Sequence, residues 1–244
     1  MKIRIDDATL HVEADGPQEA PAVLLWHGAN CTLRSWDLIV ARLADRYRLI
    51  RFDVRGHGES APARDPDTGY TFERYADDAN GLLDHFGVRR CHVWGFAWGA
   101  RGALAYAAFH PGRVASAALY DASITQPDVK AQREGTREAV RRQRAAGIRF
   151  QPPEGWNVHA DPDAAQASLA AMRRFDLPAA VDRLTMPVLV ATGDLDPNLA
   201  SSRDLVARAP DARLVVLADV GHGSVLQRPD LSVETWLEFQ ESLA

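Results

Sequence analysis

The chain is poor in cysteine, and it has no long apolar run. Cys31 and Cys91 form neither a CxxC motif nor a zinc-type spacing, so a reduced setting is favoured, and a chain of this size needs no disulfide or metal to hold its core. No apolar run approaches the length of a membrane span. The N-terminal residues 1–7 alternate and carry charge, unlike a secretory signal. We therefore expect a cytoplasmic protein with no membrane partner.

Lysine is also scarce, since only Lys2 and Lys130 are lysines among 28 basic residues, and the net charge is −5. No basic stripe stands apart from acidic neighbours, which argues against a nucleic-acid partner. The sequence shows no metal-ligand cluster, no P-loop and no dinucleotide-binding glycine fingerprint, so no cofactor is expected. With 244 residues, 46% of them hydrophobic, we expect a single domain over residues 1–244, as a monomer or homodimer.

Short apolar segments alternate with longer helical patterns along the chain. Residues 22–26 and 187–192 are apolar on both faces, which is typical of central parallel strands covered on both sides. Residues 2–6 and 10–14 alternate and predict an antiparallel hairpin at a sheet edge. The pattern predicts an α/β fold, with a mostly parallel, doubly wound sheet of about eight strands and helices on both faces. Further strands are expected at residues 47–53, 92–95, 115–120 and 213–218.

The helical patterns include one segment that breaks the alternation. Residues 72–86 carry a single apolar stripe, and residues 100–109 are small and apolar nearly all round, as in a buried central helix. Between residues 124 and 183, two helical patterns at 129–146 and 163–175 follow one another with no strand between them. The first is heavily charged, and we interpret it as a solvated helix rather than an anion site. Residues 124–183 are therefore predicted to form a small helical lid over the sheet.

A sharp strand-to-helix reversal is predicted at Gly95-Phe96-Ala97-Trp98-Gly99. Such a reversal brings two backbones into contact, which explains on steric grounds why residues 95 and 99 are both glycine. The middle residue takes a strained conformation, at a cost of about 1–3 kcal/mol. In the Gly-x-Ser-x-Gly nucleophile elbow that middle residue is the serine nucleophile. In this chain it is Ala97.

Together with four further motifs, this reversal makes the chain resemble the α/β-hydrolase family nearly from end to end. Each motif is short, but their order and spacing together are specific. The order nucleophile, acid, histidine is one that the family uses. The four further motifs are His27-Gly28, the turn at residues 53–60, Gly193-Asp194-Leu195-Asp196-Pro197 and Gly221-His222-Gly223.

The resemblance implies roles for several side chains. His222 is implied to be the general base, and Asp196 the acid that fixes its tautomer and stabilises its cation. Asp194 is a competitor for the acid, but the family pattern favours the aspartate before a proline. His57 and His27 resemble structural histidines of the family and receive no catalytic role.

The resemblance also implies an oxyanion hole and a pocket. The backbone N–H groups of Ala29 and Trp98 are implied to stabilise a developing oxyanion, and each such donor contributes about 3–4 kcal/mol in the transition state. Cys31 is expected to be a small apolar filler rather than a nucleophile, because no neighbour in the sequence would stabilise a thiolate. Trp26 and Trp94 are expected to pack in the core. The candidate substrate-binding residues are Asn30, Cys31, Trp36, Phe96 and Trp156.

Ala97 leaves three hypotheses, because without an oxygen or sulfur there can be no acyl-enzyme. In the first, a hydrolase of a small, largely apolar ester or acyl compound has had its serine replaced by alanine, as in an engineered inactive variant. In the second, a natural enzyme uses His222 and Asp196 for acid/base chemistry, as a lyase, a cofactor-free oxygenase or a carbon–carbon hydrolase. In the third, the pocket binds a small ligand without turnover. We favour the first, because the pair of His222 and Asp196 is retained. A chain that had lost its activity naturally could also have relieved the backbone strain at this position with glycine.

Overall fold

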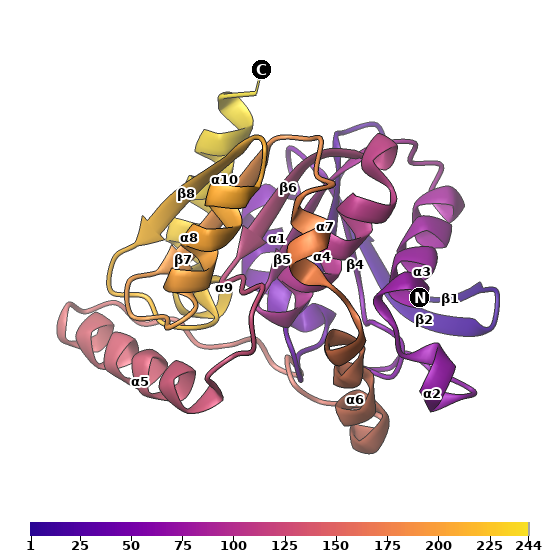
Figure 1. Ribbon diagram of the computed structural model, residues 1–244, viewed down its shortest axis with the longest axis horizontal. Coiled ribbons are helices and arrows are strands. Elements are labelled where there is room, and N and C mark those ends of the chain that lie inside the picture. Colours follow the sequence, from indigo (N-terminus) through magenta and orange to yellow (C-terminus); the bar gives the residue numbers. More distant parts are fainter. Residues whose placement is uncertain (244) are drawn as a thin grey trace.

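One sheet runs through the centre of the molecule (Figure 1). The structure is a computed structural model, and it describes residues 1–243. Each of the segments predicted to be strands forms a strand, with ends shifted by at most a few residues. The strands are β1 (Lys2–Ile5), β2 (Ala8–Asp15), β3 (Ala22–Trp26), β4 (Arg48–Phe52), β5 (Cys91–Phe96), β6 (Val114–Tyr120), β7 (Val188–Gly193) and β8 (Ala212–Leu217).

The strands lie in the order β1-β2-β4-β3-β5-β6-β7-β8. β1 and β2 form the predicted antiparallel hairpin at one edge, β2 is antiparallel to β4, and all later pairs are parallel. The register places Trp26 of β3 beside Gly95 of β5. The loops that follow these two strands therefore leave the sheet side by side. The mostly parallel α/β sheet predicted from the sequence is confirmed.

Helices cover both faces of this sheet, as predicted. One face packs in a hydrophobic core with α3 (Phe72–His85), α4 (Trp98–Phe109), α7 (Leu177–Val181) and α8 (Leu199–Arg208). The other face packs with α1 (Asp37–Leu43) and α10 (Pro229–Glu241). Trp26 and Trp94 are fully buried in these two cores, as expected.

Short helices complete the fold. They are α2 (Pro66–Gly69), α9 (Ser224–Gln227) and the 3-10 helices Leu33–Trp36 and Pro111–Arg113.

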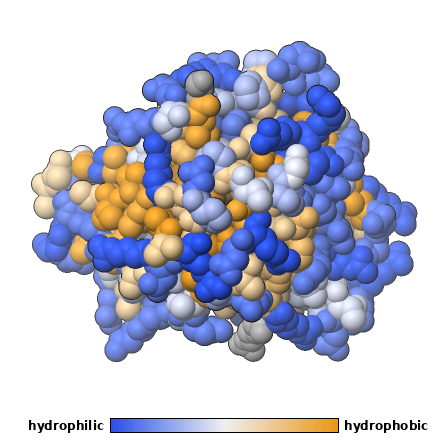
Figure 2. All heavy atoms as spheres, turned by 45° about the horizontal axis from the view of Figure 1, so that its top comes forward, coloured by the Kyte–Doolittle hydropathy of each residue, from blue (hydrophilic) through white to orange (hydrophobic). Residues whose placement is uncertain are grey.

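The surface is largely polar on the face that Figure 2 shows, where hydrophilic side chains surround smaller apolar patches. Among the described residues, no helix is both long and apolar enough to cross a bilayer.

The segment between β6 and β7 contains helices and, in its described residues, no strand. α5 (Val129–Ala145) is followed by α6 (Pro162–Ser168) and a 3-10 helix, Leu169–Arg174. The helix predicted at 163–175 is therefore an α-helix that tightens into a 3-10 helix. Figure 1 shows α5 and α6 at one end of the sheet, outside the two helical layers.

The connection from β5 to α4 is as sharp as the sequence predicts. β5 ends at Phe96 and α4 begins at Trp98, so Ala97 alone makes the reversal, with φ 55° and ψ −121°. A Cβ atom at Gly99 would lie 2.2 Å from the carbonyl oxygen of His27. One at Gly95 would lie 2.3 Å from the carbonyl oxygen of Gly99. Only glycine allows the start of α4 to contact the sheet this closely.

Gly99→Ala is expected to lower the free energy of unfolding by about 3 kcal/mol or more, because its methyl group would overlap backbone atoms that cannot move independently. Gly112→Ala is the matched control, since a Cβ at Gly112 meets nothing within 4 Å. Urea unfolding followed by tryptophan fluorescence measures both variants. Equal stabilities for the two variants would contradict the close contact of α4 with the sheet.

Candidate active site

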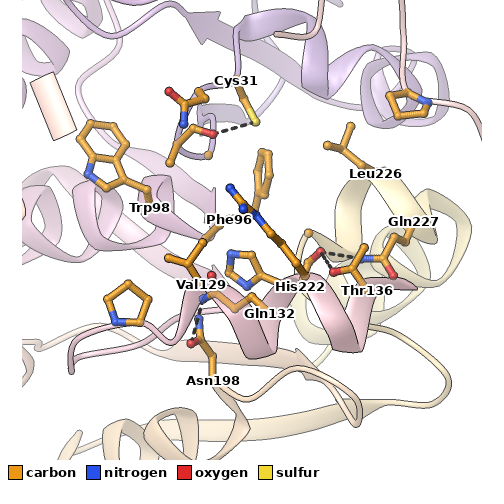
Figure 3. A pocket seen from close by; sticks show the side chains of 18 of the residues that line it. Cys31, Phe96, Trp98, Val129, Gln132, Thr136, Asn198, His222, Leu226 and Gln227 are labelled. Atoms are coloured by element: carbon orange, nitrogen blue, oxygen red, sulfur yellow. Dashed lines mark hydrogen bonds between the residues drawn. The ribbon is translucent and has the colours of Figure 1, made fainter. Parts of the chain in front are cut away.

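A cavity of about 1220 Å³ opens where the loops after β3, β5 and β8 meet. Its wall includes Ala29 after β3, Ala97 and Trp98 at the β5–α4 reversal, and His222 after β8. Figure 3 shows the imidazole of His222 and the side chains of Phe96 and Trp98 around this cavity. Segments far apart in the sequence therefore converge at one edge of the sheet.

His222 is held by contacts to its ring and to its backbone. Its Nδ1 lies 2.9 Å from Oδ2 of Asp196, whose side chain is buried in the loop after β7. Thr136 Oγ1 and Gln227 Nε2 both donate to the carbonyl oxygen of His222. A carboxylate on Nδ1 favours the tautomer with its proton there, which leaves the lone pair on Nε2. The ring is thereby arranged to accept a proton.

The environment of His222 raises its pKa. Burial alone lowers this pKa, but the hydrogen bond and the charge of Asp196 raise it, and the charge of Asp121 adds to them. The charge of Arg101 acts in the opposite direction, and the balance remains above the ordinary value. Two carboxyl groups therefore favour the imidazolium form and one guanidinium opposes it.

The structure brings Asp196, and not Asp194, to the histidine. The side chain of Asp194 accepts a hydrogen bond from the backbone N–H of Val220 at 3.3 Å, and the residue is exposed. Asp196 is 2% exposed. The residue that the family pattern favours is thus the one whose carboxylate meets the imidazole.

Two residues beside Ala97 offer free backbone N–H groups at the cavity. Ala29 and Trp98 both line it, and neither N–H has a hydrogen-bond partner in the part of the chain that the structure describes. Trp98 is the first residue of α4, so its N–H is one of the free donors of a helix N-terminus. Such donors, together with the helix dipole, favour negative charge at this point.

The predicted pocket residues fall into two groups. Asn30, Cys31, Phe96 and Trp156 line the cavity, whereas Trp36 does not. Trp36 is fully buried behind the wall, with its ring 5.3 Å from that of Phe96, edge to face. The expectation that Trp36 contacts a substrate is wrong, because the 3-10 helix Leu33–Trp36 turns its ring into the core beside α1 and α10.

Cys31 and the histidines His27 and His57 lie in buried surroundings. Burial raises the pKa of the Cys31 thiol to about 12, so the thiol stays neutral near pH 7. His27 Nε2 accepts from the backbone N–H of Val54 at 3.0 Å. His57 is buried, its Nδ1 lies 3.0 Å from Ser168 Oγ, and burial with the neighbouring histidines lowers its pKa well below the ordinary value. Neither histidine lines the cavity.

Asp121 is a site residue that the sequence analysis missed. It follows β6 directly and is fully buried, and its Oδ2 accepts from both the N–H and the hydroxyl of Ser224, at 2.8 Å each. Burial and the charge of Asp196 raise the pKa of Asp121 to about 7. It fixes the loop that carries His222. Its place directly after a central strand was the signal in the sequence that could have identified it as a site residue.

The charged helix α5 is the second departure from expectation. Arg133, Arg137 and Arg144 line the cavity, so the helix is not simply a solvated one. Its packing is close, because a Cβ at Gly135 would lie 2.0 Å from the carbonyl oxygen of Leu195. The spacing of the three arginines at i, i+4 and i+11 was the signal for one shared face.

In the part of the chain that the structure describes, no cluster of His, Cys, Asp or Glu could hold a metal ion.

Comparison with known proteins identifies the family. The profile of the alpha/beta hydrolase fold matches residues 21–151. The chain belongs to this family.

Several relatives and solved structures are similar over nearly their whole lengths. A protein of Caulobacter sp. (strain K31), provisionally named carbamate hydrolase RutD, is 29% identical, with 92% of each chain covered. The 2-(acetamidomethylene)succinate hydrolase of Mesorhizobium japonicum is 27% identical, covering 98% of this chain and 94% of its own. The crystal structure of the enol-lactonase from Burkholderia xenovorans LB400 superposes with a TM-score of 0.82 at 28% identity, covering 99% of this chain and 100% of its own.

Asp196→Asn is expected to lower the pKa of His222, because burial then acts with no full carboxylate charge on Nδ1 to oppose it. Titration of the histidine ring resonances by NMR measures this pKa directly. Asp194→Asn is the control and is expected to leave the pKa of His222 unchanged. An equal shift in both variants would contradict the pairing.

Proposed function

We propose that this chain is built as a hydrolase of a small, largely apolar ester or other acyl compound, with Ala97 at the position of the nucleophile. His222 is the general base, Asp196 orients it, and the N–H groups of Ala29 and Trp98 form the oxyanion hole. The observation that carries the proposal is the meeting of three features at one cavity: the 2.9 Å His222–Asp196 pair, Ala97, and two N–H groups without a partner among the described residues. The names of the relatives support it, since a carbamate, an acetamido compound and an enol-lactone are all acyl compounds.

The mechanism follows from these positions if residue 97 carries a hydroxyl. His222 Nε2 takes the hydroxyl proton as the oxygen attacks the acyl carbon, and the resulting oxyanion accepts from Ala29 and Trp98. Collapse of this intermediate expels the leaving group, which takes the proton from His222. Water, deprotonated by the same imidazole, then releases the acid. A methyl group cannot attack, and loss of the serine in a comparable triad costs about 10⁶-fold in kcat.

The conformation of Ala97 supports this interpretation over a site adapted to alanine. A non-glycine residue at φ 55° and ψ −121° is strained by about 1–3 kcal/mol. A protein with no use for a side chain here could relieve that strain with glycine.

Residues 124–183 serve in this proposal as the lid over the cavity, since Val129, Trp156 and Leu169 from this segment line it.

A second candidate is acid/base chemistry without a covalent intermediate, as in a lyase, a cofactor-free oxygenase or a carbon–carbon hydrolase. One observation favours it: the His222–Asp196 pair is fully formed with no hydroxyl at position 97. His222 would then take a proton directly from the bound substrate or from a water molecule, and the chain would be active as it stands. A pocket that binds without turnover is the third outcome.

Ala97→Ser is expected to raise the hydrolysis of p-nitrophenyl acetate by roughly 10³-fold or more and to create a residue that reacts with an organophosphate. Spectrophotometric rates and mass spectrometry measure the two effects. The double variant Ala97→Ser/His222→Ala is the control and should lose both. A folded Ala97→Ser variant that neither hydrolyses the ester nor reacts with the organophosphate would contradict the proposal. Turnover by the unaltered chain that His222→Ala abolishes would establish the second candidate instead.

A further inference from the structure

Arg101 is a charged residue in the cavity wall that no step above uses. It lies on α4, one helical turn after Ala97, and is 4% exposed. Its Nε donates to the carbonyl oxygen of Ser123 at 2.8 Å, and its Nη2 donates to that of Thr125 at 2.9 Å. These bonds fix the guanidinium. Its third nitrogen, Nη1, has no partner among the described residues.

No carboxylate compensates this buried charge. Among residues 1–243, no Asp or Glu forms an ion pair with Arg101, and burial lowers its pKa to about 10, which still leaves it charged near pH 7. The guanidinium also lies close enough to His222 for its charge to act on the imidazole. A buried charge without an opposite charge beside it is unfavourable, and an anion that enters the cavity would reduce that penalty.

The mouth of the cavity carries charge of the same sign. Arg133, Arg137 and Arg144 line it from α5, and Arg149 lines it just beyond the helix, while the described lining residues include no Asp or Glu. Arg141 and Arg142 of the same helix do not line the cavity, and both are paired with Glu138 at 2.7 Å. The arginines of α5 that line the cavity have no ion-pair partner among the described residues. Such a field of one sign concentrates anions at the opening.

We infer that the substrate of this site is an acyl compound that also carries a carboxylate, and that the carboxylate accepts hydrogen bonds from Arg101. The inference rests on the proposed function and adds the substrate class to it. Residues 97 and 101 are about one helical turn apart and line the same cavity, so one substrate can meet both. A single buried guanidinium balances the single negative charge of a carboxylate. The arginines of α5 draw the anion to the opening.

The unaltered chain allows a test by binding alone, since Ala97 prevents acylation. The probes are monomethyl glutarate, which carries a carboxylate, and dimethyl glutarate, its neutral counterpart. Titration calorimetry is expected to show that the chain binds monomethyl glutarate at least about tenfold more tightly, because only this ester forms a charge-assisted bond in the wall. This comparison needs no variant, so it does not depend on the folding of one.

Variants then assign the preference to Arg101. Arg101→Gln is expected to weaken binding of monomethyl glutarate about 30-fold, which is typical for loss of a buried charge partner, and to leave dimethyl glutarate unchanged. Arg141→Gln is the matched control, since Arg141 does not line the cavity and is paired with Glu138, and it should change neither affinity. Arg137→Gln is expected to reduce the association rate of monomethyl glutarate in a salt-dependent way.

Equal or undetectable binding of the two esters by the unaltered chain would overturn the inference. So would an Arg101→Gln variant that weakens both esters equally, because Arg101 would then only support the backbone at Ser123 and Thr125. The proposed function fails separately, since its test uses the neutral p-nitrophenyl acetate. An inactive Ala97→Ser variant that still prefers the carboxylate would refute the hydrolase proposal and keep an anion site at Arg101.

Discussion

The backbone contact between the end of β3 and the start of α4 is the constraint on which the site depends. Gly99 lies so close to the carbonyl groups of Trp26 and His27 that the chain leaving β5 has one residue in which to reverse. That residue, Ala97, takes a left-handed φ, and the first residue of α4, Trp98, then lines the cavity. If α4 began later or further from the sheet, its N-terminus would no longer share a cavity with His222.

Buried charges of both signs act on His222. Asp196 and Asp121 are buried and raise its pKa, and Asp121 also ties the loop of His222 to the end of β6. Arg101 is buried with no carboxylate partner in the described chain, and its charge lowers that pKa. Arg101 therefore acts on the pKa of His222 and, in our proposal, also decides the charge that the cavity accepts. Apolar side chains such as those of Phe96 and Trp156 line the same cavity.

The sequence predicted those features whose cause is local. The central strands follow from apolar runs, the edge hairpin follows from alternation, and the reversal at Ala97 follows from the spacing of Gly95 and Gly99. The orientation of Trp36 could not be predicted, because a short 3-10 helix decides whether its ring enters the cavity or the core. The role of α5 was missed for a similar reason. A charged helix shows its periodicity in sequence, but the side that docks depends on the contact of Gly135 with the loop before Asp196.

The most direct test of the central claim is a crystal structure of the Ala97→Ser variant that has reacted with a small alkyl phosphonate. The phosphoryl oxygen is expected to lie about 2.7–3.1 Å from the backbone nitrogens of both Ala29 and Trp98, with His222 Nε2 on the side of the leaving group. A phosphoryl oxygen directed away from either nitrogen, or an imidazole turned out of the cavity, would contradict that claim.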